Sequence, residues 1–127
     1  MVPIAGLGNF LHIYDFYVEK ENIDEFIRLF NEFDYGGDNP MHKSPAQVKD
    51  GALCQDVKDP THFWLIGEWN DIEEHAKIRK VLANELKPAF VKLIKGNGFV
   101  PFYAKVVSAT PQAILDKAEA DKKAKAA

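Results

Sequence analysis

The chain has 127 residues, of which 46% are hydrophobic and 28% charged, and its formal net charge is −3. This acidic balance argues against the basic surface that nucleic-acid binding and polybasic membrane contacts require. No stretch approaches the ~18 apolar residues of a membrane-spanning helix, and the first residues carry no secretory signal. We therefore expect a cytoplasmic protein with one domain over residues 1–127, divided into a core of about 9–108 and a tail of 109–127.

A strand and a helix are predicted near the start of the chain. The run Phe10–Val18 is dense in β-branched and aromatic residues, and both of its alternating faces are largely apolar, as in a strand buried on both sides. Asn22 and Glu25 form a capping-box pattern, and apolar residues then recur at helical spacing as far as Phe33. The pattern therefore predicts a helix over 23–33.

A long segment without regular apolar spacing follows, over 34–51. It contains paired glycines and an Asn-Pro pair, and Ser44-Pro45 can begin one short helical turn. Two interpretations stay open. The segment is either a surface insertion or a flap over a pocket, with ligand contacts from Tyr35, Met41 and His42.

The second half of the chain alternates strands and helices. Asp59-Pro60 is a turn signal between two short apolar runs, which predicts a β-hairpin. Asn70 and Glu73 form a second capping box. The predicted elements are, in chain order, strands over 52–57 and 61–69, a helix over 71–84, a helical piece over 89–95, a strand over 99–108 and a C-terminal helix over 112–127.

This order of elements predicts an α+β protein with the ferredoxin-like βαββαβ arrangement. Helices would cover one face of a four-stranded antiparallel sheet, and a helical tail would follow. The other face would still carry large apolar groups such as Trp64 and Ile66. A second copy of the chain is the economical cover, because most soluble oligomers are symmetric. We therefore expect a homodimer.

The run Phe63–His75 contains a strand that ends in Glu68-Trp69, followed by a polar cap and a helix. It resembles the antibiotic-biosynthesis-monooxygenase-like domains of the dimeric α+β barrel superfamily, over about residues 9–108. The resemblance implies a homodimer whose sheets face each other, with a pocket between sheet and helices in each monomer. Some members of that family oxidise aromatic polyketides without a cofactor, others degrade haem, and others act on small signalling molecules.

Haem degradation is not expected of this chain. The haem-degrading branch of the family uses an asparagine of the first strand, a tryptophan of the third strand and a histidine about nine or ten residues further on. Only Trp69 matches, because Ile78 and Arg79 occupy the histidine positions and His75 comes too early. In the first strand, Asn9 lies too close to the start.

Two histidines are candidates for a site. His75 lies three positions after Ile72, near the inward side of its helix, and it is either a pocket base or a core histidine with a satisfied hydrogen bond. His12 shares a strand face with Tyr14 and Phe16, but the sequence leaves the direction of this face open. If the face points toward the helices, a pocket with apolar walls and few polar groups forms; otherwise the aromatic residues are core. The pocket set is His12, Tyr14, Phe16, Phe63, Leu65, Trp69 and His75.

Two functions of different classes fit these residues. The first is a cofactor-independent monooxygenase that acts on a small aromatic or polyketide-like molecule; the same parts would serve an isomerase or a lyase. The second is a non-catalytic domain for ligand binding or interaction. No spacing of potential ligands indicates a metal site, and no cofactor is expected. In the enzyme, the base is His75 or His12, the hydrogen-bond donor is Tyr14, and the substrate-binding walls are Phe16, Phe63, Leu65 and Trp69.

Overall fold

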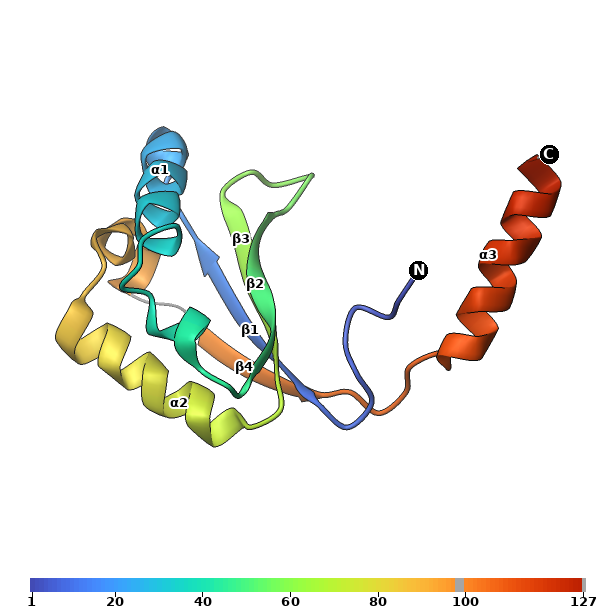
Figure 1. The fold of residues 1–127 in the computed structure, drawn as a ribbon. Helices are drawn as coiled ribbons and strands as arrows, with labels where there is room; N and C mark the ends of the chain where they lie inside the picture. Colours follow the sequence, from blue (N-terminus) through green and yellow to red (C-terminus); the bar gives the residue numbers. More distant parts are fainter. Residues whose placement is uncertain (98–99, 127) are drawn as a thin grey trace.

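The computed structural model of the chain describes residues 1–97 and 100–126. Its four strands form one antiparallel sheet in the spatial order β2-β3-β1-β4 (Figure 1). This order confirms the predicted ferredoxin-like arrangement, because β1 and β3 lie side by side at the centre of the sheet. The bounds are Phe10–Tyr17 for β1, Gln47–Gln55 for β2, His62–Trp69 for β3 and Val100–Lys105 for β4.

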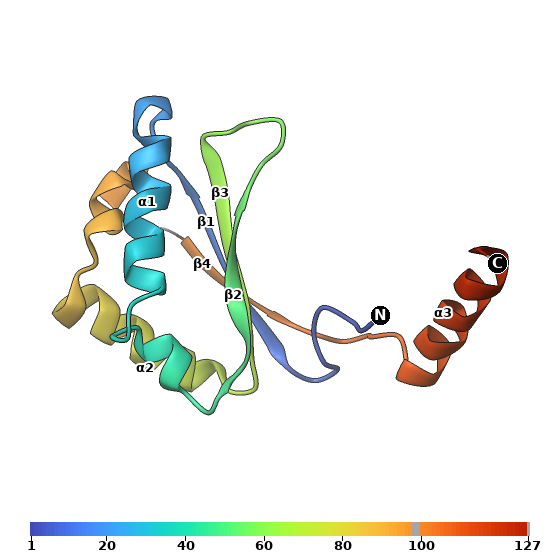
Figure 2. The ribbon, with the colours of Figure 1, turned by 45° about the horizontal axis from the view of Figure 1, so that its top comes forward.

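Two helices cover one face of this sheet: α1, Ile23–Asp34, and α2, Ile72–Val81 (Figures 1 and 2). The C-terminal helix α3, Gln112–Ala126, stands away from the sheet and has no buried residue among those described. Shorter helical turns complete the described part of the chain. They are η1 Lys20–Asn22, η2 Pro40–Lys43, the π-helical turn η3 Leu82–Leu86, η4 Ala89–Leu93 and η5 Lys95–Asn97.

The hydrophobic core lies between α1, η4 and the sheet, and it is rich in phenylalanine. Phe16 of β1 stacks on Phe63 of β3 with 5.8 Å between ring centroids, and Phe26 of α1 contacts both rings. Phe26 and Phe30 are four positions apart, so helical periodicity turns both toward the sheet. Each buried phenylalanine contributes about 1.5–3 kcal/mol by leaving water. This core fixes α1 on the sheet.

The loop that the sequence predicts over 34–51 is shorter in the structure, because β2 begins at Gln47. The start of β2 pairs irregularly with β3, so its residues do not show the regular alternation that identifies a strand from sequence. The short helical turn is also displaced. It spans Pro40–Lys43, where the Asn39 side chain accepts a hydrogen bond from the backbone nitrogen of Met41, whereas Ser44 has extended backbone angles.

The helix starts also differ in detail from the expected caps. The side chain of Asp71, not that of Asn70, accepts hydrogen bonds from two backbone nitrogens in the first turn of α2. Helix α1 begins behind a 3-10 turn, and Asn22 makes no side-chain capping bond. Helix α2 ends at Val81, where the π-helical turn takes over. The predicted strand start at 99 and the end of the tail at 127 lie outside the described residues.

The middle of the sheet face that is turned away from the helices is apolar, and no helix or strand in residues 1–97 and 100–126 covers it. Ile13 of β1 lies beside Ile66 of β3 and Phe102 of β4, and Phe102 is 52% exposed. Trp64 belongs to the same face, since it alternates with the buried Phe63. The prediction that Trp64 and Ile66 point away from the helices is therefore confirmed. No helix in residues 1–97 and 100–126 is long and apolar enough to cross a membrane.

Candidate functional site

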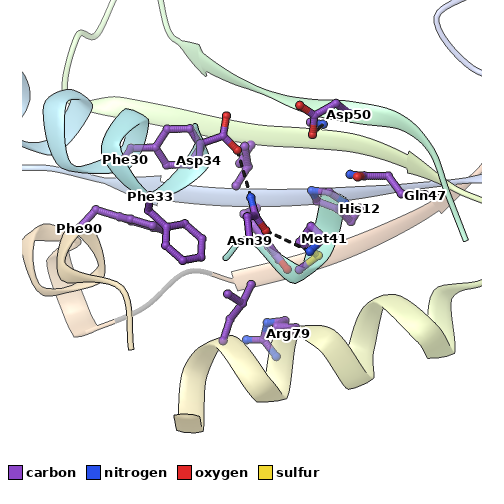
Figure 3. A pocket seen from close by; sticks show the side chains of 14 residues that line it. His12, Phe30, Phe33, Asp34, Asn39, Met41, Gln47, Asp50, Arg79 and Phe90 are labelled. Carbon is purple, nitrogen blue, oxygen red and sulfur yellow. Dashed lines mark hydrogen bonds between the residues drawn. The ribbon is translucent and has the colours of Figure 1, made fainter. Parts of the chain in front are cut away.

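A cavity of about 80 Å³ lies between the sheet and the helices and is partly open to solvent (Figure 3). Its floor comes from β1 and β3, where His12, Tyr14 and Leu65 line it. Its sides come from the end of α1, the segment that carries η2, the strand β2, helix α2 and the turns after it. Most of the lining surface is apolar, so a bound molecule would contact only a few polar groups.

His12 is held in one protonation state and one tautomer. The indole nitrogen of Trp69 lies 2.8 Å from Nδ1 of His12, and an indole can only donate a hydrogen bond. Nδ1 therefore accepts, and the neutral ring carries its proton on Nε2. Burial, and then the neighbouring His75, lower the pKa of His12 to about 3, so the ring is neutral at pH 7. Its Nε2–H has no partner among the described residues and is the group left for a ligand.

The ring of His12 needs the space that Gly67 leaves on the neighbouring strand. The two residues are paired across β1 and β3. A Cβ atom on Gly67 would lie 2.6 Å from Cε1 of His12, closer than side chains can approach. The glycine therefore allows the imidazole to lie over β3.

His75 lies fully buried between two tyrosines. Its Nε2 is 2.8 Å from the hydroxyl of Tyr14, and its Nδ1 is 2.8 Å from the hydroxyl of Tyr103. Burial, followed by the positive charge of Arg79, lowers the pKa of His75 to about 4. A neutral imidazole has one N–H and one bare nitrogen, so His75 donates to one tyrosine and accepts from the other. The three residues form one continuous hydrogen-bonded chain.

This chain leads from the cavity toward the protein surface. Tyr14 lines the cavity and is 3% exposed, whereas Tyr103 at the other end is 39% exposed. Burial raises the pKa of both phenols above the usual value, so both are neutral at pH 7. Each member of the chain can donate and accept, and a proton can therefore pass along it when the hydrogen bonds reverse in turn.

The rings of His75 and Trp69 lie behind the cavity wall. His75 stacks on His12 with 4.5 Å between ring centroids and 10° between their planes. Trp69 meets His75 edge-on at 4.9 Å, and both residues are fully buried. The two residues, which the sequence analysis expected to line the pocket, are therefore neighbours. Both lie behind His12 and Tyr14 rather than in the cavity wall.

The structure also shows where the other predicted site residues lie. The face of β1 that the sequence left without a direction points toward the helices, which brings His12 and Tyr14 to the cavity wall, beside Leu65 of β3. Phe16 and Phe63 are paired with each other further along the sheet, under α1, and belong to the hydrophobic core. They stabilise the fold and do not line the cavity.

Three residues of the site escaped the sequence analysis. Arg79 follows His75 by four positions, so helical spacing already places both on one side of α2. Tyr103 is paired with His12 across β4 and β1, a register that no sequence pattern indicates. Gly67 faces His12 for the same kind of reason, because strand pairing decides its neighbour.

The segment over 34–51 contributes to the rim of the cavity. Met41 lines it, whereas Tyr35 is 78% exposed. Nε2 of His42 lies 3.4 Å from Asp34 and 2.9 Å from Asp50, so both carboxylates meet one nitrogen. The three ligand atoms lie within 4.8 Å of one another. In the described part of the chain, this is the cluster at which a divalent cation could be held by nitrogen and oxygen ligands.

Comparison with known proteins identifies the fold. No family model and no curated protein matches the chain. Among solved structures, the chain is similar to a dimeric ferredoxin-like protein from an uncultured marine organism, with a TM-score of 0.62 and 16% identity over 82% of this chain and 92% of the other. It is similar to a candidate antibiotic biosynthesis monooxygenase from Nitrosomonas europaea, with a TM-score of 0.61 and 14% identity over 79% and 91%.

A third solved structure is an antibiotic biosynthesis monooxygenase, with a TM-score of 0.51 and 23% identity over 80% of this chain and 99% of the other. All three likenesses cover nearly the whole of the other protein and most of this chain. At these sequence identities the three likenesses show the fold alone. The chain therefore has the ferredoxin-like α+β fold of the antibiotic biosynthesis monooxygenases.

Proposed function

We propose that the protein is a cofactor-independent monooxygenase that removes a proton from a small aromatic molecule in the cavity and lets the resulting anion react with O₂. The observation that carries this proposal is the chain Tyr14–His75–Tyr103, which joins the cavity wall to the surface through two hydrogen bonds of 2.8 Å. The fold shared with antibiotic biosynthesis monooxygenases supports the same class of chemistry. A volume of about 80 Å³ favours a single aromatic ring, or a ring-sized part of a polyketide-like molecule.

The first proposed step is proton removal. An O–H or activated C–H of the bound molecule lies against Tyr14, whose oxygen takes that proton while its own proton passes to Nε2 of His75. His75 then gives the proton on Nδ1 to Tyr103, and Tyr103 releases a proton to water. One proton leaves the ligand and one reaches solvent, and each protein group ends neutral, as the low pKa of His75 requires.

His12 acts in this proposal as a hydrogen-bond donor and not as a base. Its Nε2 already carries a proton, and its Nδ1 is occupied by the indole N–H of Trp69. The ring can therefore donate to an anionic oxygen but cannot accept a proton from the ligand. A fixed donor in an apolar cavity stabilises a developing negative charge without solvent reorganisation. Proton transfer thus belongs to Tyr14 and His75, and anion stabilisation to His12.

The anion then reacts with O₂, which is the oxidant of the proposed reaction. At an activated CH₂ group, a new C–O bond forms and loss of water leaves a carbonyl, so that CH₂ and O₂ give C=O and H₂O. One oxygen atom enters the product, and the other leaves as water with both hydrogen atoms. Most of the cavity lining is apolar, which limits the contact of the reactive intermediate with water.

Oxygen consumption tests this proposal. The purified chain is supplied with single-ring hydroquinones and phenols that carry an activated position, and O₂ is followed with an electrode. Tyr103→Phe keeps the ring but removes the hydroxyl at the surface end, so it should lower turnover by ~10²-fold or more. Tyr35→Phe, at a 78% exposed tyrosine, is the control and should leave the rate unchanged. Equal rates in wild type and Tyr103→Phe would contradict the proposed proton path.

Two alternative functions give different outcomes in the same experiment. A non-catalytic binding domain would bind the aromatic molecule, consume no O₂ and exchange none of its hydrogen. An isomerase or lyase would use the same hydrogen-bonded chain, so it would exchange ligand hydrogen for deuterium in D₂O without O₂ uptake. Exchange together with O₂ uptake, both lowered in Tyr103→Phe, is the result expected of the monooxygenase.

We also propose that a second copy of the chain covers the outer face of the sheet. Ile13, Trp64, Ile66 and Phe102 form an apolar surface there that no described element covers. Such a surface favours association in water, and one protein of this fold is described as dimeric. Sedimentation at micromolar concentration should therefore give twice the 14.3 kDa mass of the chain, and a 14.3 kDa species would contradict the dimer.

A further inference from the structure

The chain has two arginines, and their environments differ. Arg28 lies on the exposed side of α1, where it pairs with Glu25 and Glu32. Arg79 lies on α2, one turn after His75, and is half-buried at the cavity wall. Its Nε is buried without a hydrogen-bond partner, and no carboxylate in residues 1–97 and 100–126 forms an ion pair with it.

A half-buried guanidinium without an anion is an unfavourable arrangement. Burial removes water from a charged group, and this costs free energy unless a partner replaces the water. An arginine cannot escape the cost by losing its proton, as a buried lysine or histidine does. A bound anion is therefore the natural partner of Arg79.

The titratable groups whose pKa values respond to Arg79 do not supply that anion. Its charge helps to lower the pKa of His75 and opposes the burial that raises the pKa of Tyr14 and of Tyr103. Burial prevails at both tyrosines, so neither becomes an anion at neutral pH. The cation therefore faces neutral groups on this side of the cavity.

The carboxylates that line the cavity lie on its other side. Asp34, at the end of α1, and Asp50, in β2, meet Nε2 of His42 at 3.4 and 2.9 Å. Figure 3 shows Asp34 and Asp50 toward β2, whereas Arg79 comes from α2. The cavity is thus polarised, with an unpaired cation at α2 and acidic groups partnered by a histidine at the opposite rim.

We propose that Arg79 is the anion-binding residue of the cavity and that the cavity takes a small aromatic carboxylic acid, bound as its carboxylate. The planar guanidinium matches a carboxylate through two parallel hydrogen bonds. The aromatic ring then packs against the apolar wall that includes Leu65 and Leu82, within reach of His12 and Tyr14. The inference rests on the proposed function for the use of this cavity, and it names the substrate class.

Binding of benzoate, with benzamide as a neutral ligand of the same shape, tests the inference. Calorimetry at low salt compares wild type, Arg79→Gln and the matched control Arg28→Gln. Arg79→Gln keeps a polar side chain but removes the charge, so it should weaken benzoate binding by ~10- to 100-fold, through lost charge-assisted hydrogen bonds. Benzamide binding should stay the same in all three proteins, and Arg28→Gln should bind benzoate like wild type.

The ligand-free protein gives a second readout. Removal of an unpaired, half-buried cation should leave the unfolding temperature of Arg79→Gln equal to that of wild type or higher. A merely structural arginine would instead lower it. The inference is overturned if wild type shows no saturable benzoate binding at millimolar concentration, if benzoate and benzamide bind equally, or if Arg79→Gln is less stable than wild type.

Failure of this inference can be told from failure of the proposed monooxygenase. Benzoate binding that depends on Arg79, without O₂ consumption for any aromatic acid, would keep the anion site and reject the monooxygenase. O₂ consumption with neutral phenols that is unchanged in Arg79→Gln would keep the monooxygenase and overturn the anion site.

Discussion

The two faces of the sheet both hold histidines among aromatic rings, and the histidines differ in charge. On the helix side, burial lowers the pKa of His12 to about 3 and that of His75 to about 4. On the outer side, burial also lowers the pKa of His62, but hydrogen bonds to Asp15 and Asp56 outweigh it and raise the pKa overall.

The difference shows that the charge of a histidine depends on its hydrogen-bond partners as much as on its burial. The partners of the two inner histidines are an indole N–H and two phenols, none of which carries the negative charge that would stabilise an imidazolium. His62 has a carboxylate at each ring nitrogen. On the inner side, the groups beside α2 are therefore neutral apart from Arg79, and the carboxylates of Asp34 and Asp50 lie at the opposite rim with His42. The outer face keeps the charges around His62 paired at the edge of an apolar surface.

The largest expected effect is that of Trp69→Ala. Trp69 is fully buried and donates a hydrogen bond to His12, so its loss leaves a cavity and an unpaired nitrogen. We expect a decrease of about 3–5 kcal/mol in the free energy of unfolding, measured by urea denaturation. Trp64→Ala on the outer face should cost clearly less at low protein concentration. Equal losses would mean that the two faces do not differ in packing.

The pH dependence of stability should reflect the same contrast. In the unfolded chain, His12 and His75 bind protons near the ordinary histidine pKa of about 6.5, whereas the folded rings stay neutral down to about 3 and 4. Between about pH 6.5 and pH 4 the unfolded state therefore binds up to two more protons, and the free energy of unfolding falls by up to ~2.7 kcal/mol per unit as the pH drops. Urea denaturation over this range measures the slope.

His62 supplies the matched control for this slope. Its pKa is raised in the folded state, so its stabilisation is present in acid and is lost as the pH rises through that raised pKa. His62→Gln should therefore lower the free energy of unfolding below about pH 6.5 without changing the slope between about pH 6.5 and pH 4, whereas His75→Gln should flatten that slope. The same change of slope in both variants would contradict the opposite charge states of the two faces.

Gly67→Ala should have an intermediate effect. The added methyl would lie 2.6 Å from Cε1 of His12, so the imidazole must move, and such overpacking costs about 1–3 kcal/mol of folding free energy. Gly37→Ala is the control, because a Cβ there meets nothing within 4 Å. Thermal unfolding of the two variants measures the difference. An unchanged Gly67→Ala protein would mean that His12 is free to lie elsewhere.

The smallest effect on the folding free energy, but a large one on mass, is expected of Trp64→Glu. Surface substitutions usually change the folding free energy by only about 0.5 kcal/mol. A carboxylate on the outer face should nevertheless prevent a second copy from covering it, and light scattering should then show the monomer. A dimer that survives Trp64→Glu would place the interface elsewhere.

The sequence predicts which face of the sheet carries the site better than it predicts where along each strand the cavity begins. The alternation of side chains in β3 places Trp69 on the helix side of the sheet. Helix α2 follows β3 directly, and helical periodicity turns His75 toward Trp69, so both positions can be predicted from local sequence patterns. Alternation does not tell how far along a strand a cavity begins, so Phe16 and Phe63 are on the expected side but in the core. Tyr103 depends on the pairing of β4 with β1, which is a long-range contact.

The central claim is that two histidines at the cavity, His12 in its wall and His75 behind it, are neutral and have fixed hydrogen bonds. Nitrogen-detected NMR of ¹⁵N-labelled protein measures the charge and tautomer of each ring as the pH is varied. We expect His12 to carry its proton on Nε2, and neither His12 nor His75 to titrate between about pH 5 and pH 8, while His62 titrates above the usual value. A proton on Nδ1 of His12, or titration of His12 or His75 near pH 6.5, would contradict the claim.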